Sequence, residues 1–132
     1  MNTIHKAGAL IIKDKKILLT KSHGKSIYIT PGGKYEKGEN TEECLRRELK
    51  EELQVTVKSF NHYKNYHFEK DAYREMPLDI ELYFVEIEEE PKVSSEIESM
   101  EWLTKEDIEN KKVNLAPSFD TFLPDFIKDG LL

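Results

Sequence analysis

The segment from Asn40 to Gln54 is the most strongly patterned part of this 132-residue chain, and it predicts a helix. Asn40 is a favourable N-cap, and Glu43, three residues later, completes a capping-box pattern. The apolar side of the helix consists of leucines spaced four residues apart, Leu45, Leu49 and Leu53. Because such a stripe has to be buried, the rest of the chain must supply a surface for this helix to cover.

Short segments rich in β-branched and aromatic residues lie on both sides of this helix and predict strands. The expected strands are residues 4–12, 16–20, 26–30, 55–68, 78–87 and 100–103. The segment 13–15 should join the first two as a hairpin, the segment 31–33 should end the third, and 78–87 should be buried on both faces. A second helix is expected over residues 118–128, kinked or divided by Pro124. The order β-β-β-α-β-β-β-α predicts an α/β fold in which helices pack on a mixed sheet.

Composition excludes several classes of protein. The chain is 38% hydrophobic and 35% charged, without the run of about 18 apolar residues that a membrane span needs. We expect one domain over residues 1–132 and no secretory signal at its start. A lone Cys44 excludes a disulfide scaffold and a cysteine-based zinc site, and it favours a reducing, cytoplasmic location. The formal charge of −6 argues against a protein that binds nucleic-acid polymers by bulk electrostatics.

Charge is unevenly distributed along the chain. Residues 1–37 hold eight lysines and two acidic residues, a net charge of +6, so the remainder carries −12. An uneven balance is compatible with a merely solvated surface. The functional alternative is a site where the basic part meets anionic groups and the acidic part holds a cation.

Three glutamates on the first helix, Glu48, Glu51 and Glu52, stand at positions i, i+3 and i+4. They share an arc of roughly 100° beside the leucine stripe, where mutual repulsion and partial desolvation both disfavour the ionised forms. Arg47 is placed to pair with Glu51, but one arginine does not neutralise three carboxylates. A hard divalent cation such as Mg²⁺ would do so, since it takes oxygen ligands. The simpler interpretation is a charged helix face in a glutamate-rich protein.

The spacing around these glutamates resembles the signature of the Nudix (MutT-like) hydrolase family. Gly33 is followed after five residues by Glu39, and after seven more by Arg47-Glu48-Leu49-Lys50-Glu51-Glu52-Leu53-Gln54-Val55. Every fixed position of that signature matches except one, where the family has glycine and this chain has Gln54. The resemblance implies a Nudix-type α/β/α sandwich with a mixed β-sheet and two main helices. At Gln54 we expect a left-handed residue at the helix end, or a different ending.

The resemblance also implies roles for particular residues. Glu48, Glu51 and Glu52 would bind Mg²⁺ (or Mn²⁺) or act as the base, with Glu52 the first choice as direct ligand. The backbone carbonyl of Gly33 would approach the metal, Arg47 would orient the glutamates, and Glu39 would hold the loop. A further carboxylate often precedes the last strand in this family, and Glu96 is the candidate here, although it could equally be an ordinary loop acid.

Substrate contacts are less well defined by the sequence. Lys21, Lys25 and Lys34 could face substrate phosphates, as basic residues do in MutT-like proteins, or simply be solvated. Tyr28 could stack on a base, although a strand tyrosine is more often packed. The asparagine that reads an oxidised guanine in MutT would fall near residues 116–118, where this chain has none.

The resemblance implies an Mg²⁺-dependent hydrolase that cleaves the pyrophosphate linkage of a nucleoside diphosphate linked to X, and we expect it to be of the nucleoside triphosphate pyrophosphohydrolase type. In this chemistry the metal lowers the pKa of a water and bridges phosphate oxygens, and a carboxylate, Glu48 or Glu51, accepts the proton. The expected partner is a small nucleotide derivative, and a homodimer is compatible with the resemblance. The alternative is a nucleotide-binding or sensor module, a class that usually loses the box glutamates that are all present here.

Overall fold

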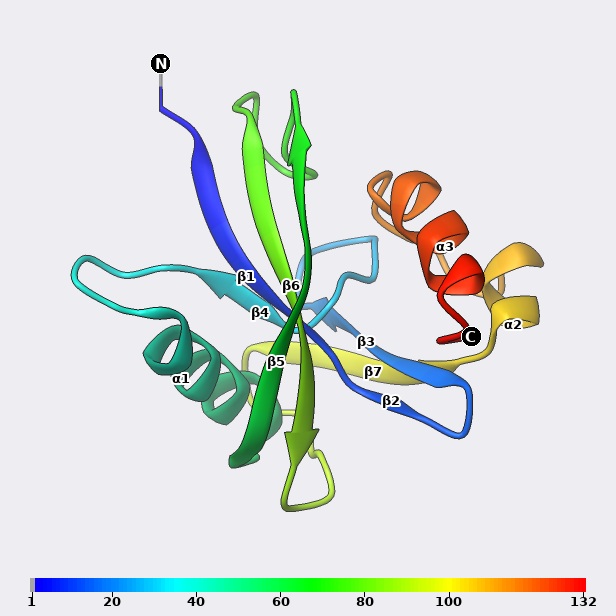
Figure 1. Cartoon of the computed structure of the whole chain (residues 1–132), viewed down its shortest axis with the longest axis horizontal. Coiled ribbons are helices and arrows are strands. Elements are labelled where there is room, and N and C mark those ends of the chain that lie inside the picture. Colours follow the sequence, from blue (N-terminus) through cyan, green and yellow to red (C-terminus); the bar gives the residue numbers. More distant parts are fainter. Residues whose placement is uncertain (1) are drawn as a thin grey trace.

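The computed structural model describes residues 2–132 and contains seven strands and three helices (Figure 1). In chain order these are β1 (Ile4–Leu10), β2 (Ile12–Lys13), β3 (Lys16–Ser22), β4 (Gly32–Lys34), α1 (Thr41–Leu53), β5 (Val57–Phe68), β6 (Leu78–Ile87), β7 (Ile97–Leu103), α2 (Lys105–Glu109) and α3 (Phe119–Lys128). Among the described helices, none combines the length and apolarity that a membrane crossing needs.

The strands form two sheets. The larger sheet has the order β4-β1-β6-β5, and it is mixed because β1 runs parallel to β6 while the other pairs are antiparallel. The smaller sheet has the order β2-β3-β7 and is antiparallel. The predicted mixed sheet is therefore confirmed, with the addition that the chain divides its strands between two sheets.

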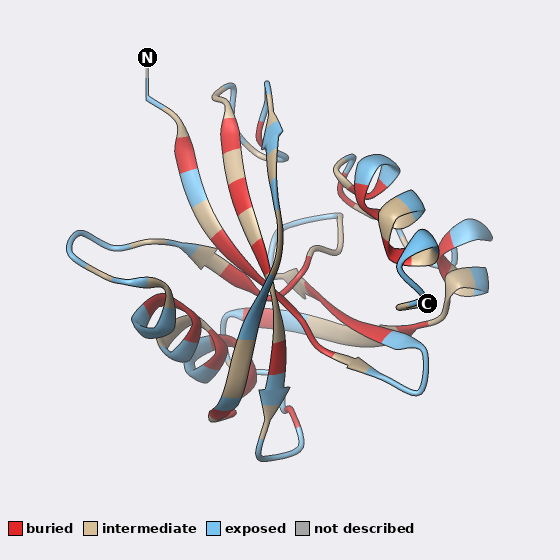
Figure 2. Ribbon diagram, in the orientation of Figure 1, coloured by how far each residue is buried: buried red, intermediate tan, exposed pale blue. Residues whose placement is uncertain are grey.

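Helices cover opposite sides of the sheets, α1 on one side and α3 on the other (Figure 1). The leucine stripe of α1 packs on a cluster that includes Ala7, Ala9 and Val85, and all three leucines are fully buried (Figure 2). A second cluster, on the α3 side, contains the buried phenylalanines of that helix together with core residues of β1, β3 and β6. The predicted α/β/α sandwich is confirmed.

The ends of α1 also agree with the sequence. The Asn40 side chain accepts a hydrogen bond from the Glu43 N–H at 2.8 Å, and the Glu43 side chain accepts one from the Asn40 N–H at 3.0 Å, which completes the capping box. Gln54 lies at the other end with φ 58° in the left-handed region, and its N–H donates to the Lys50 carbonyl. The position where the family has glycine thus keeps the glycine-like backbone at a cost of roughly 1–2 kcal/mol.

One predicted strand is displaced. The segment 26–30 makes only isolated bridges, at Tyr28 and Ile29, and the strand is instead β4, which includes the two glycines expected to end it. The reason is steric: a Cβ atom on Gly32 would lie 2.1 Å from the Ala7 carbonyl oxygen. Only glycine allows this segment to approach β1 closely enough to pair with it.

Other differences are smaller. The hairpin turns at Asp14 and Lys15, both with positive φ, but it joins β2 to β3, while β1 ends at Leu10 and belongs to the other sheet. Pro124 does not divide helix α3, which continues from Phe119 to Lys128; Pro124 and Asp120, whose carbonyl loses its helical partner, are both exposed.

Two further elements differ from expectation. Strand β6 alternates buried and half-buried residues instead of being buried on both faces, since Asp79 and Glu81 lie on the side that α1 does not fully cover. Helix α2 was missed, although Thr104 and Asp107 form a second capping box that the sequence displays.

Candidate active site

Glu52 is the most buried carboxylate on α1, with 9% of its surface exposed. It accepts a hydrogen bond at 3.1 Å from the Gly32 N–H, which joins the end of the helix to the start of β4. Burial raises the pKa of Glu52 well above its ordinary value, and the nearby charges of Glu48 and Glu96 raise it further, while the Gly32 hydrogen bond opposes both. A cation bound here would stabilise the ionised form of Glu52, which burial and the neighbouring charges disfavour.

Glu48 lies directly against Gly33. A Cβ atom built on Gly33 would be 2.7 Å from the carboxyl carbon of Glu48, so this glycine leaves the space that the carboxylate occupies. Glu48 is mostly buried, with a side chain that is 15% exposed. The Gly33 carbonyl oxygen lies 3.6 Å from the Sγ of Cys44, which donates to it.

Arg47 holds the acidic residues around it in one network. Its Nε and Nη2 donate to both carboxylate oxygens of Glu39 at 2.6 and 2.9 Å, and its Nη1 donates to Glu48 at 2.7 Å and to Glu51 at 3.4 Å. The hydrogen bonds from Arg47 hold the pKa of Glu39 down at about 2. Arg47 also donates to the Lys34 carbonyl at 3.0 Å, so it fastens the loop to the helix.

Glu96 reaches this site from the segment before β7. That segment is bonded to the end of α1, because the Ser94 N–H donates to the Glu52 carbonyl at 3.1 Å and the Lys92 N–H donates to the Leu53 carbonyl at 2.9 Å. Glu96 is exposed, and its charge acts on the pKa of Glu52. The structure therefore places Glu48 beside Glu52, with Glu96 close enough for its charge to act on Glu52 and with Glu51 exposed.

The donor set suits a hard divalent cation. Within residues 2–132, no group of three or more histidine, cysteine, aspartate or glutamate side chains is arranged so that it could hold a metal ion. Mg²⁺ does not require such a group, because it is typically held by one or two carboxylates together with substrate phosphates and water. Two adjacent, largely buried carboxylates, Glu48 and Glu52, meet that description.

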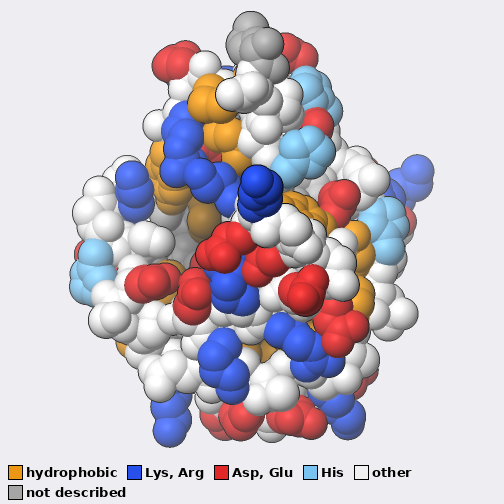
Figure 3. Space-filling model, turned by 90° about the vertical axis from the view of Figure 1, so that its left-hand side faces the viewer, with side chains coloured by type: hydrophobic (Ala, Val, Ile, Leu, Met, Phe, Trp, Pro, Cys, Tyr) orange, Lys and Arg blue, Asp and Glu red, His pale blue; other side chains and the backbone are white. Residues whose placement is uncertain are grey.

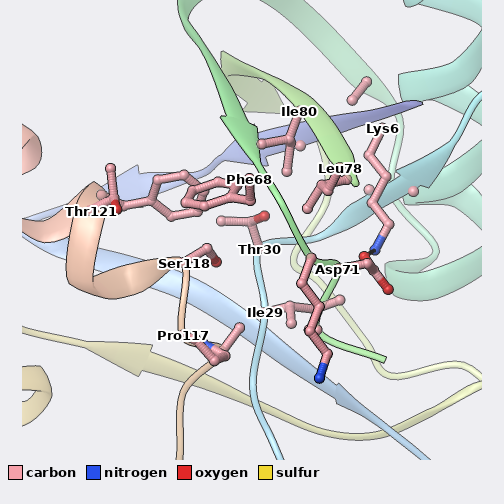
Figure 4. Close-up of a pocket in the computed structure, with 18 of the residues that line it drawn as sticks. Lys6, Ile29, Thr30, Phe68, Asp71, Leu78, Ile80, Pro117, Ser118 and Thr121 are labelled. Atoms are coloured by element: carbon pink, nitrogen blue, oxygen red, sulfur yellow. Dashed lines mark ion pairs between the residues drawn. The ribbon is translucent and has the colours of Figure 1, made fainter. Parts of the chain in front are cut away.

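The structure also contains a cavity of about 520 Å³ (Figure 4). Its apolar wall is made by Ile29, Phe68, Leu78, Ile80 and Phe122, and its polar groups include Lys6, Thr30, Ser118 and Thr121. Gly32 and Gly33 line the same cavity, and these are the glycines in contact with Glu52 and Glu48. Figure 3 shows this side of the molecule, where acidic side chains gather near the centre, basic ones lie above them and the surface is hollowed nearby.

The predicted substrate residues are not among the described residues that line this cavity. Lys21 pairs with Glu98 at 2.7 Å, and this contact raises the pKa of Lys21. The hydroxyl of Tyr28 is hydrogen-bonded to Ser99 at 2.7 Å. The ammonium of Lys25 lies 4.5 Å from the ring centroid of Tyr73.

Lys34 is placed differently, because it is exposed and is the cross-strand partner of Lys6. Lys6 is the charged residue that sequence reasoning missed, and a signal for it exists. It interrupts a row of apolar or small residues at alternating positions of β1, formed by Ile4, Gly8 and Leu10.

Comparison with known proteins agrees with this geometry. The NUDIX domain family matches residues 4–126, whereas curated proteins gave no match. A MutT NUDIX hydrolase from Burkholderia pseudomallei superposes with a TM-score of 0.79 at 23% identity, over 94% of this chain and 98% of that one. A MutT structure from a study of Aliivibrio salmonicida and Vibrio cholerae gives 0.76 at 25% identity, over 97% and 99%. A UDP-X diphosphatase gives 0.76 at 17% identity, over 98% and 64%.

The matched residues contain both the carboxylate group on α1 and all of the residues that line the cavity. The chain therefore belongs to the Nudix family, and it is a hydrolase that acts on phosphoanhydride bonds.

Proposed function

We propose that this enzyme is an Mg²⁺-dependent pyrophosphohydrolase of a nucleoside diphosphate linked to X, with nucleoside triphosphates as the substrate type. Mn²⁺ is the alternative metal. The observation that carries the proposal is the double role of Gly32 and Gly33, which line the cavity and also contact the carboxylates of Glu52 and Glu48. A ligand whose nucleoside fills the cavity would place its phosphates beside these carboxylates.

Each residue of the acidic group has a proposed part. Glu48, Glu51, Glu52 and Glu96, with the Gly33 carbonyl, would hold the cation, and the burial of Glu52 favours it as the direct ligand. When bound, the cation supplies a water of lowered pKa and positive charge beside the diphosphate. Glu48 is our choice for the carboxylate that accepts the proton of the attacking water, with Glu51 second. Arg47 would keep Glu48 and Glu51 in place through its hydrogen bonds to both.

The cavity supports a nucleoside as the recognised part of the substrate. Phe68 and Phe122 offer aromatic surface, and Thr30, Ser118 and Thr121 offer hydroxyls for hydrogen bonds. Among solved structures of the same fold, one is named a UDP-X diphosphatase, and that name describes an enzyme of a nucleotide derivative. Lys34 is the best placed of the predicted phosphate contacts, while Lys21, Lys25 and Tyr28 already have partners.

A cytoplasmic location fits the lone buried thiol of Cys44, which a reducing compartment would leave free. We include it in the proposal together with a small-molecule partner.

The proposal is tested with a substrate panel. The protein is incubated with nucleoside triphosphates, dinucleoside polyphosphates and nucleotide sugars, with Mg²⁺ or with EDTA, and the released mononucleotide and pyrophosphate are quantified. We expect turnover of at least one class in Mg²⁺ and none in EDTA. Turnover that persists in EDTA would contradict the metal dependence, and tight nucleotide binding without turnover on any substrate would favour a sensor module.

A further inference from the structure

A lysine occupies a core-facing position of a central strand. The side chains of β1 that face α3 alternate with those that face α1, and the α3 row is Ile4, Lys6, Gly8 and Leu10. Three of these four positions are apolar or small, as expected for a strand that lies between β4 and β6. A charged group here costs desolvation energy, so its presence calls for a specific partner or ligand.

The partner within the protein is Asp71, from the loop between β5 and β6. The Lys6 Nζ lies 3.1 Å from Asp71 Oδ1, and the side chains are 15% and 0% exposed. The other oxygen of Asp71 accepts from the Tyr73 N–H at 3.0 Å and lies 3.5 Å from Arg74 Nη1. Asp71 is therefore fixed from two directions, and it fixes the position of the Lys6 ammonium.

The Lys6 ammonium keeps hydrogen-bonding capacity for a ligand. An ammonium carries three N–H donors, and among residues 2–132 Asp71 is its only acidic partner within ion-pair distance. Lys6 lines the cavity, so a ligand can reach it. In Figure 4, Lys6 and Asp71 lie on one side of the cavity and Ser118 and Thr121 lie on the opposite side.

The surroundings of Lys6 favour an anion over a neutral group. Lys6 is in register with Lys34 on β4, and cross-strand partners project from the same face of a sheet. Two like charges side by side repel each other, and one aspartate does not neutralise both. Lys6 is followed in β1 by Ala7 and Gly8, which pair with Gly33 and Gly32. These two glycines contact the carboxylates of α1. An anionic oxygen at this point would lie between the nucleoside cavity and the cation site.

We propose that Lys6 is a substrate-binding residue that donates to the phosphate nearest the nucleoside, and that Asp71 is the positioning residue that holds it there. This rests on the proposed nucleotide substrate, but it needs no turnover. It adds a phosphate contact inside the cavity, separate from the loop lysines.

Metal-free binding tests the proposal. Nucleosides and the matching nucleoside 5′-monophosphates of the four common bases are titrated calorimetrically into the full chain in EDTA. We expect the wild type to bind its preferred monophosphate about tenfold or more tighter than the nucleoside, the size of one charge-assisted hydrogen bond. Lys6→Met should bring this ratio to within about twofold of unity. Lys58→Met is the matched control, because it removes the same charge from an exposed position near the start of β5. It should leave the ratio unchanged.

Two more variants separate binding from structural support. Lys6→Arg keeps the charge and should keep most of the phosphate preference, and it serves also if Lys6→Met does not fold. Asp71→Asn keeps Lys6 but loosens its position, so the preference should fall only about two- to threefold and stay clearly above that of Lys6→Met.

The outcomes that would overturn the proposal are distinct. A wild type without preference for the monophosphate would overturn it, as would a Lys6→Met variant that keeps the preference or that loses affinity for nucleoside and monophosphate equally. An Asp71→Asn variant as defective as Lys6→Met would indicate a purely structural ion pair. Because the titrations contain no metal, failure of the proposed hydrolysis would appear in the substrate panel and not here.

Discussion

The two halves of the candidate site are built in opposite ways. Apart from Glu96, the carboxylate half comes from one continuous stretch, residues 32–54, in which a loop and a helix are joined by Arg47, Glu39 and the Gly32–Glu52 hydrogen bond. The cavity half is assembled from β1, β4, the β5–β6 loop, β6 and α3, whose contributing residues run from Lys6 to Phe122. The carboxylates are therefore positioned by residues close to them in the sequence, whereas the cavity forms only when distant segments come together in the fold.

The comparison also separates two kinds of function. The carboxylate half would do the same chemistry on any diphosphate, because its oxygens address only the cation and the attacking water. The cavity half would decide which substrate is presented to that chemistry. Changes in the first half should lower kcat, and changes in the second should raise KM.

The largest effect is expected for Glu52→Gln. Glutamine can still accept the Gly32 hydrogen bond but loses the charge that would hold the cation, so we expect kcat to fall about 10³-fold or more, as for loss of a transition-state charge contact. Because the pKa of Glu52 is raised by burial, the unfolding temperature should stay the same or rise. Steady-state kinetics and thermal unfolding measure both effects. A variant that keeps a tenth of the wild-type kcat would exclude Glu52 as the main ligand.

A smaller but still large effect is expected for Gly33→Ala. The new methyl carbon would lie 2.7 Å from the Glu48 carboxyl carbon, so that carboxylate must move. We expect activity to fall about 10²-fold, since displacements near 1 Å have this effect. Gly130→Asn is the control, because Gly130 has φ +74° and open space around it, which asparagine tolerates. Equal activity of Gly33→Ala and wild type would show that activity does not depend on the present position of the Glu48 carboxylate.

The cavity half is tested by filling it. Thr121 lines the cavity from α3, and Thr121→Phe should obstruct part of it. We expect KM to rise about tenfold while kcat stays within about threefold, the pattern of lost uniform binding. Thr121→Ser keeps the hydroxyl and should change KM less than about twofold. If the phenylalanine variant lowered kcat and left KM unchanged, the division between the two halves would be wrong.

The smallest effect concerns acid stability of the carboxylate half. The pKa of Glu39 is about 2 in the folded protein against an ordinary 4.5, owing to its hydrogen bonds from Arg47. A depressed folded pKa contributes stability above the unfolded pKa, and this contribution is lost as pH falls from about 4.5 to about 2. Denaturant unfolding across that window should therefore show a smaller loss of stability for Glu39→Gln than for wild type. If the free energy of unfolding changed with pH in parallel for the two proteins, Glu39 would not contribute to acid stability.

The sequence predicts the carboxylate half well because its contacts are local. Asn40 and Glu43, three residues apart, cap the helix. The four-residue spacing of the leucines is enough to predict the buried face of the helix. Gln54 takes the left-handed backbone expected of the glycine it replaces. These features depend on neighbours within a few turns, and the pattern displays them.

The cavity half could not be obtained from the sequence in the same way. Lys6 and Asp71 are 65 positions apart, and nothing near either residue identifies its partner. Lys21 was a candidate phosphate contact, with a solvated lysine as the alternative, and neither interpretation anticipated its ion pair with Glu98, 77 positions away. Strand β4 was misplaced because its glycines were interpreted as an ending, whereas their close approach to β1 exists only in the folded sheet.

The central claim is that both halves serve one ligand through Gly32 and Gly33. It is tested most directly by measuring how Mg²⁺ changes the affinity for a non-hydrolysable α,β-imido analogue of the preferred nucleoside triphosphate. We expect Mg²⁺ to tighten binding about tenfold or more in the wild type, and Glu52→Gln to lose this gain while keeping the metal-free affinity. Affinity that is the same with and without Mg²⁺ in the wild type would contradict the claim.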